Sequence, residues 1–157
     1  MIPDLIAFVI FLPFRRSQPM TDPKAMQELI SGFQARGVEV ISSHPRCNEK
    51  NLYGLYIRGS REIVVCERGD QTYTLRHEGW HLVQSLCLQG KQWLTSVAIE
   101  NDLDKQDRAE LSLFVRMEGW TKEAEARVMA KKTPKQYFEE FDSACWQPIN
   151  TNEPYIQ

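Results

Sequence analysis

The segment His77-Glu78-Gly79-Trp80-His81 lies within a longer stretch that has the residue spacing of an α-helix. Asp70 can cap the start of this helix with its carboxylate, and Gly90 is suited to end it. Leucines at helical spacing would bury one side of it: Leu75, Leu82 and Leu86. The sequence therefore predicts a helix that presents two histidines, one turn apart.

Two imidazoles four residues apart on a helix differ by about 40° around its axis and one turn along it. Both can bind one ion, and zinc is the usual metal for such a pair. Glu78 lies next to His77, where it could take a proton from a water bound to the metal. The alternative is an ordinary helix whose histidines pack or face solvent. The chain has only three histidines, and two fall in this pattern, which favours the metal site.

A catalytic zinc ion generally has three protein ligands and one open position. Cys87, six residues after His81, would point about 240° away from it on a continuous helix, so it is excluded. Two carboxylates further along the chain, Glu123 and Glu125, are the remaining candidates, and they would lie about 200° apart on a helix.

Glu123 shares its helix face with small or apolar residues, namely Trp120, Ala126 and Ala130. Glu125 shares its face with a more polar set, which we expect to be solvated. Because a helix that packs closely on the histidine helix needs small side chains beside the ligand, we predict Glu123 as the third ligand.

His77-Glu78-x-x-His81 followed by Glu123-x-x-Ala126-x-x-Met129-Ala130 resembles the pattern of gluzincin metallopeptidases. It is most similar to compact regulatory members of the ImmA/IrrE type. The resemblance implies a minimal zincin-like domain in which His77, His81 and Glu123 bind Zn²⁺ and Glu78 is the general base. The sequence departs from the family at two places. Arg127 stands where larger gluzincins often carry an acidic residue, and Lys131-Lys132-Thr133-Pro134 stands where the family motif usually ends with an aliphatic residue and a proline. These departures leave the subfamily and the substrate open.

The predicted activity is zinc-dependent hydrolysis of peptide bonds in a peptide or protein substrate, with Glu78 accepting a proton from the metal-activated water. Tyr137 or Tyr73 could donate to the scissile oxygen, and the strand at 63–67 could accept an extended substrate along its edge.

The alternative is a catalytically silent zincin-fold protein that acts as a binding or regulatory module, for which three tryptophans could supply a surface: Trp80, Trp93 and Trp120.

Further elements follow from local signals, and together they predict an α+β fold, a small antiparallel sheet followed by packed helices. Asp22 and Pro23 start a helix that extends to about residue 36. Strands are expected at 38–41, 52–57 and 63–67, the last two as a hairpin, with His44 in a solvated loop. Residues 91–105 have no clear assignment, with a polar loop at 101–104. Helices are expected at about 106–117, 120–132 and 134–145.

The chain has 157 residues and a net charge of −2, which suits one soluble domain and gives no sign of nucleic-acid binding. Its four cysteines are far apart and include no CxxC pair. They are therefore predicted to be free thiols of a reducing compartment, which points to the cytoplasm.

Residues 20–146 form the predicted domain, between an apolar extension at 1–19 and a tail at 147–157. The extension is too short and too interrupted for a stable membrane span, and it lacks the pattern of a secretory signal. It is a buried or partner-binding tail, a weak membrane anchor, or an upstream extension from a wrong start codon. We favour the last, because Met20 begins a cleaner sequence. The oligomeric state does not follow from the sequence.

Overall fold

The computed structural model describes residues 21–114 and 117–145, so the predicted extension at 1–19 and the tail at 147–157 lie outside the described residues. The described part is α+β, as predicted, and none of its helices is long and apolar enough to cross a membrane. Its elements in chain order are α1 Pro23–Ala35, β1 Glu39–Ile41, the 3-10 helix η1 Pro45–Asn48, β2 Gly54–Tyr56, β3 Glu62–Val65, α2 Gln71–Leu86, α3 Ser96–Asp102, α4 Lys105–Phe114, α5 Met117–Ala130 and α6 Pro134–Cys145.

Helix starts follow the local signals of the sequence. The Asp22 carboxylate accepts a backbone N–H in the first turn of α1, with Pro23 at the first helical position. Asp70 caps α2 in the same way, and the Thr133 hydroxyl accepts a backbone N–H at the start of α6. These three predicted helix starts are confirmed.

The sheet has the strand order β1-β3-β2. β2 and β3 form the predicted antiparallel hairpin, with Leu55 opposite Val64. β1, however, pairs parallel to β3, with Val40 opposite Ile63. The prediction of an antiparallel sheet is therefore wrong, because the sheet is mixed. The prediction that residues 63–67 offer an edge to a substrate is also wrong, because β3 is the central strand and is paired on both sides.

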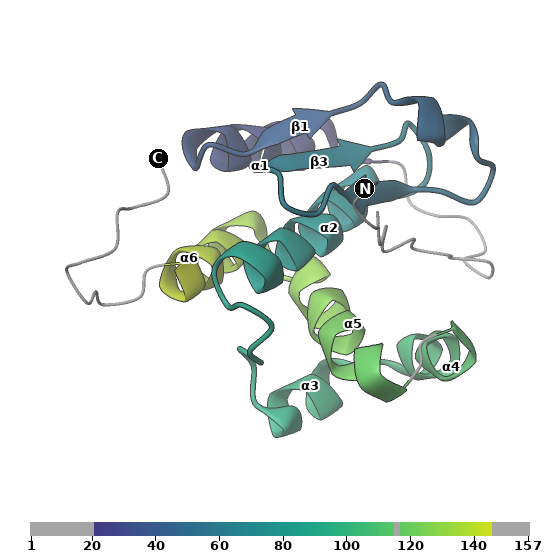
Figure 1. Cartoon of the computed structure of the whole chain (residues 1–157), viewed down its shortest axis with the longest axis vertical. Coiled ribbons are helices and arrows are strands. Elements are labelled where there is room, and N and C mark those ends of the chain that lie inside the picture. The colour runs from purple at the N-terminus through teal and green to yellow at the C-terminus, as the bar shows by residue number, and fades with distance from the viewer. Residues whose placement is uncertain (1–20, 115–116, 146–157) are drawn as a thin grey trace, which may run out of the picture.

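Helix α2 lies at the centre of the molecule (Figure 1). It packs against β2 and β3 and contacts α1, α5 and α6. The sheet and α1 lie at one end of the molecule, and α3 and α4 lie at the other. Helix α5 joins the two parts, because Ala126 and Met129 belong to the main core around α2, whereas Ala124 and Val128 belong to a second core with α3 and α4.

Helix α3 lies in the stretch that the sequence left without assignment, and it includes part of the predicted loop at 101–104. The Thr95 hydroxyl caps it, and Ile99 buries its inner side in the second core. A helix of only seven residues is too short to show a convincing helical period, which explains why sequence analysis did not identify it.

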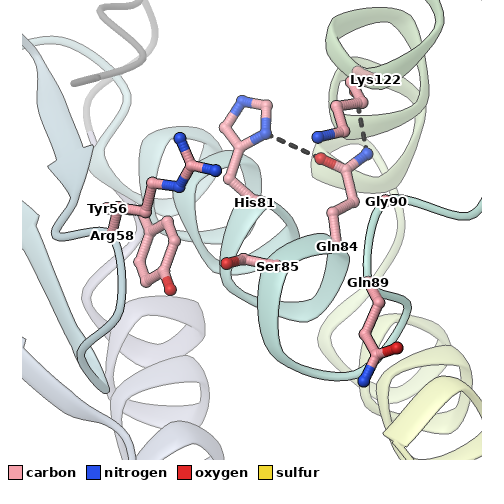
Figure 2. A pocket seen from close by; sticks show the side chains of 8 residues that line it. All are labelled: Tyr56, Arg58, His81, Gln84, Ser85, Gln89, Gly90 and Lys122. Carbon is pink, nitrogen blue, oxygen red and sulfur yellow. Dashed lines mark hydrogen bonds between the residues drawn. The ribbon is translucent and has the colours of Figure 1, made fainter. Parts of the chain in front are cut away.

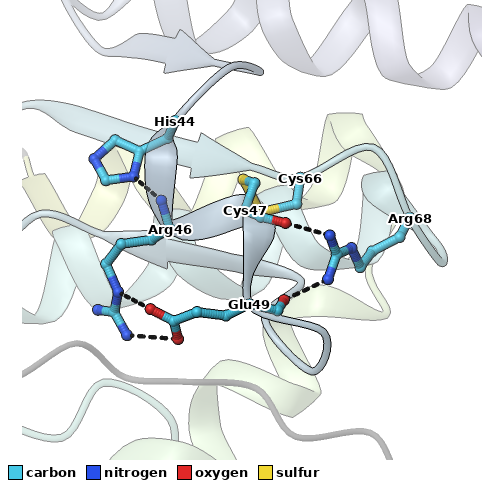
Figure 3. The surroundings of a disulfide bond; sticks show 6 residues. All are labelled: His44, Arg46, Cys47, Glu49, Cys66 and Arg68. Carbon is cyan, nitrogen blue, oxygen red and sulfur yellow. Dashed lines mark hydrogen bonds and ion pairs between the residues drawn. A yellow bond between two sulfur atoms is a disulfide. The ribbon is translucent and has the colours of Figure 1, made fainter.

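The cysteines form two disulfides, Cys47–Cys66 and Cys87–Cys145, so the prediction of free thiols is wrong. Figure 3 shows the first bond beside Arg68, whose guanidinium donates to the backbone oxygens of Cys47 and Glu49. Disulfides persist mainly in oxidising compartments. The predicted cytoplasmic location rested on free thiols and has therefore lost its support.

Candidate metal centre

Helix α2 places the two imidazoles of the predicted pair side by side. The Nε2 atoms of His77 and His81 are 3.1 Å apart, and the two rings are nearly perpendicular. Helix α5 brings the Glu123 carboxylate to the same point, with Oε1 3.0 Å from Nε2 of His77 and Oε2 3.2 Å from Nε2 of His81. The three predicted ligands thus offer donor atoms that all lie within 4.8 Å of one another.

The donor set fits the metal that the resemblance implies. Ligand atoms around a tetrahedral ion with bonds of about 2.0–2.1 Å lie roughly 3.3 Å apart, close to the separations found here. Two histidines and one glutamate are a common protein ligand set of catalytic zinc. All three side chains are buried, so few water molecules would compete with them for a cation.

Small residues let α5 approach α2 closely enough for Glu123 to reach the histidines. Ala126 and Ala130 are fully buried on the same side of α5 as Glu123, as the sequence predicted. Glu125 does not contact the histidine pair, but the expectation that it lies on a solvated face is wrong, since its exposed fraction is 1%.

Glu125 instead holds three segments together through hydrogen bonds. Its Oε1 accepts from the indole N–H of Trp80 at 2.8 Å and from the side-chain amide of Gln84 at 3.1 Å. Its Oε2 accepts from the backbone N–H groups of Trp93 and Leu94 at 2.8 and 2.9 Å. Glu125 therefore fixes α5 to α2 and to the segment that follows α2.

Gln84 orients His81, a role that sequence analysis missed. The Gln84 amide nitrogen donates to the Lys122 carbonyl oxygen at 3.0 Å and to Glu125, so its Oε1 faces Nδ1 of His81 at 2.8 Å. Nδ1 must then carry the proton, which leaves the lone pair on Nε2 for a cation. The only signal in the sequence was its position three residues after His81, on the same side of the helix.

Glu78 is fully buried where α2 packs on the edge strand β2. Its Oε2 accepts a hydrogen bond from the backbone N–H of Tyr56 at 3.0 Å. Its Oε1 has no hydrogen-bond partner among the described residues. Burial raises the pKa of Glu78 to about 8, and the nearby Glu123 carboxylate adds to this effect. Glu78 thus has one oxygen available to exchange a proton.

Electrostatic coupling joins the three predicted ligands. Burial lowers the pKa of His77 and outweighs the opposing charge of Glu123. Burial also disfavours the charged form of His81, but hydrogen bonding to Glu123 prevails and raises its pKa. The two histidines hold the pKa of Glu123 well below its usual value despite its burial. Glu123 is therefore an ionised carboxylate, the form that binds a cation.

Arg127, the departure from the gluzincin pattern, is a buried cation beside Glu123. Its Nε lies 3.7 Å from Oε1 of Glu123. Its Nη1 lies 2.6 Å from Oε2 of Glu110 and 3.4 Å from Oδ1 of Asp107, both on α4. The α4 carboxylates thus balance the charge of Arg127, which connects the candidate site to the second core.

The two tyrosines considered as donors to a scissile oxygen differ in position. The Tyr137 hydroxyl donates to the Arg76 carbonyl oxygen at 2.8 Å within the aromatic core, so it is not available as a donor. The Tyr73 ring stacks on His77 with ring centroids 6.0 Å apart.

His44, the third histidine, lies in its predicted loop, where Nδ1 accepts the backbone N–H of Arg46.

A cavity of about 430 Å³ opens onto the site (Figure 2). His81 lines it, whereas His77 and Glu123 are not among its lining residues. Figure 2 shows the hydrogen bond from His81 to Gln84 at the wall of this cavity. A molecule that reaches the three clustered side chains through this cavity would therefore meet His81 first.

Comparisons of this chain with models of protein families, with curated proteins and with solved structures gave no match.

Proposed function

We propose that this protein is a zinc-dependent metallopeptidase with a zincin-like domain, related to the gluzincins that its sequence resembles. The observation that carries the proposal is the convergence of His77, His81 and Glu123 next to a buried Glu78 with one oxygen available. A structural ion pair between histidines and a glutamate would not require a second buried carboxyl group at the same place.

Each residue has one role in the proposed reaction. His77, His81 and Glu123 hold the ion, which when bound supplies a Lewis acid and lowers the pKa of water. Glu78 accepts the proton of the attacking water at Oε1 and passes it to the nitrogen of the leaving amine as the C–N bond breaks. Gln84 keeps the imidazole of His81 in the tautomer that binds a cation.

The outer edge of β2 replaces β3 as the proposed docking strand for a substrate. Ile57 and Tyr53 form backbone hydrogen bonds to the β3 side of the hairpin, so the alternate residues Gly54 and Tyr56 direct their backbone groups away from β3. Tyr56 also lines the cavity that reaches His81. Because the Tyr56 N–H is already bonded to Glu78, an extended peptide would pair with this edge through the other outward backbone groups of β2.

The alternative, a catalytically silent binding or regulatory module, has less support in the structure. Trp80 is fully buried, and its indole N–H is bonded to Glu125. Trp93 and Trp120 are half-buried and pack against the two cores. These tryptophans therefore do not form an exposed aromatic surface for a partner.

Metal analysis and cleavage assays together test the proposal. The purified wild-type chain should hold about one zinc ion, and H81A and E123A should each lose most of it. E78Q should keep the metal but fail to cleave an unfolded protein that the wild type cleaves. Wild-type protein without zinc under replete conditions would refute the metal site. Zinc with no cleavage of any unfolded substrate would favour the silent module, and cleavage by E78Q would refute Glu78 as the base.

A further inference from the structure

The cavity at His81 continues into a second one of about 250 Å³, because Gln84, Gly90 and Lys122 line both. We call the two cavities together the basic groove. The cationic side chains on its walls are Arg58, Lys91 and Lys122. The rest of its lining is mainly amide, hydroxyl and backbone groups, so polar and charged contacts dominate its surface.

The groove contains a single carboxylate, Glu125, among its lining residues. Both Glu125 oxygens are already occupied, since they accept four hydrogen bonds from neighbouring N–H groups. The lining therefore has three cations against one carboxylate, although the whole chain has a net charge of −2. The local charge of the groove is opposite to that of the molecule.

The three groove cations have no carboxylate partner among the described residues, a property that they share with Lys24 and Lys135 but not with five other cations. Arg36, Arg46, Arg108, Arg127 and Lys131 each pair with an acidic side chain. No ion pair between residues that the structure describes involves Arg58, Lys91 or Lys122. Their charges are thus available to an anionic ligand.

Two of these cations flank the proposed reaction site. Figure 2 shows Arg58 on the sheet side of His81 and Lys122 on the α5 side, with the imidazole between them. Consider an extended peptide that passes His81 with one of its peptide bonds opposite the imidazole. Such a peptide would have one of these cations within reach on each side of that bond.

From the groove we infer the substrate class: a peptide with aspartate or glutamate side chains on both sides of the bond to be cleaved. This inference rests on the proposed function for the cleavage step, whereas the binding preference for acidic peptides depends on the groove alone. Opposite charge in a cleft steers ligands to it and excludes ligands of like charge.

Binding is measured first on the full-length wild-type chain in excess EDTA, so that peptide carboxylates cannot bind a metal and no cleavage occurs. The probes are two decapeptides with the same uncharged dye, one alternating alanine with glutamate and the other alanine with lysine. We expect the acidic peptide to bind about tenfold tighter at low salt, and we expect the difference to shrink in 0.5 M salt. Equal affinity for the two peptides would overturn the inference.

Charge reversal locates the effect. R58E combined with K122E should abolish or invert the preference, whereas K24E combined with K135E changes the net charge equally at positions that line neither cavity. An equal loss in both double variants would refute the groove as the binding site. Tighter binding of a ten-residue thymidine oligonucleotide than of the acidic peptide would also overturn the inference, in favour of nucleic acid.

With zinc restored, cleavage of a mixed peptide library should occur at sites flanked by aspartate or glutamate, and R58E should weaken that preference on one side of the bond. If the proposed function fails, no peptide is cleaved while the acidic peptide still binds tighter. If the inference fails, cleavage occurs with no acidic preference.

Discussion

Glu78 has an unusual environment for a carboxyl group, since it is fully buried and one of its oxygens has no partner among the described residues. Its pKa of about 8 means that the metal-free protein holds a proton there at neutral pH. A bound cation would favour the ionised form of this carboxyl group and thereby release the proton.

Stability of the metal-free protein should therefore depend on pH through Glu78. Between about pH 4.5 and 8 the folded state binds a proton that the unfolded state has lost, so the free energy of unfolding falls as pH rises. E78Q lacks this proton, and its stability relative to wild type should increase by about 3 kcal/mol from pH 5 to pH 8. Urea unfolding of both chains in EDTA measures this, and parallel stability curves would contradict it.

Gln84 should control metal affinity without contacting the metal. Q84L removes the acceptor for Nδ1 of His81, so zinc affinity should fall about 10- to 100-fold. Competition with a chromophoric chelator measures the affinity, and circular dichroism verifies that the variant is folded. Q27L makes the same substitution at an exposed position on α1 and should leave zinc affinity unchanged. Equal affinity of Q84L and wild type would refute the orienting role.

Gly79 sets how closely α2 packs on its neighbours. A Cβ atom at this position would lie 2.3 Å from Cζ of Phe33 on α1 and 2.7 Å from the hydroxyl oxygen of Tyr137 on α6. G79A should therefore destabilise the fold by about 1–3 kcal/mol, although alanine favours helices more than glycine does. Thermal and urea unfolding measure the loss.

A second substitution distinguishes crowding from other causes. F33L shortens the side chain that a Cβ at position 79 would meet, so G79A should cost less in the F33L background than in wild type. Strictly additive free energies would show that the clash with Phe33 is not the reason.

Helices could be predicted where their signals are local in the sequence. Asp22, Asp70 and Thr133 bond to N–H groups two to three residues away, so a single segment contains the whole pattern. Strand order depends on contacts between distant segments, and the parallel pairing of β1 with β3 has no such signal. The burial of Glu125 depends on Trp93 and Leu94, which lie about 30 residues earlier in the chain.

The candidate site was predictable for a related reason. His77 and His81 are placed by helical geometry alone, and the small residues near Glu123 indicated which carboxylate could approach them. The supporting groups were not predictable, because the contacts of Gln84 with Lys122 and Glu125 and of Glu78 with Tyr56 depend on how α2 packs on α5 and β2.

Considered as a whole molecule, the chain is cross-linked twice. The cysteines carried no sequence signal for pairing, because Cys87 and Cys145 are 58 residues apart and are brought together by the packing of α6 on α2. The Cys47–Cys66 bond joins η1 to the residue that follows β3.

Reduction should destabilise the protein through the unfolded chain. On the loop-entropy relation, the bond across 58 residues contributes about 4 kcal/mol and the bond across 19 residues about 3 kcal/mol. The double substitution C87S with C145S should therefore cost more than C47S with C66S. Urea unfolding of the two variants and of the reduced wild type measures this. A larger loss for the shorter loop would contradict the relation here.

The two cross-links bracket the helix that carries the histidine pair. Cys66 lies a few residues before α2, and Cys87 is its C-terminal capping residue. The disulfides tether the segment before α2 to η1 and the end of α2 to α6, so opening of the whole helix would have to move both tethers, and its central amide protons should exchange slowly with solvent. The two imidazoles lie in the middle of α2. An ion bound to them would therefore leave through the cavity beside His81 rather than by unfolding of α2.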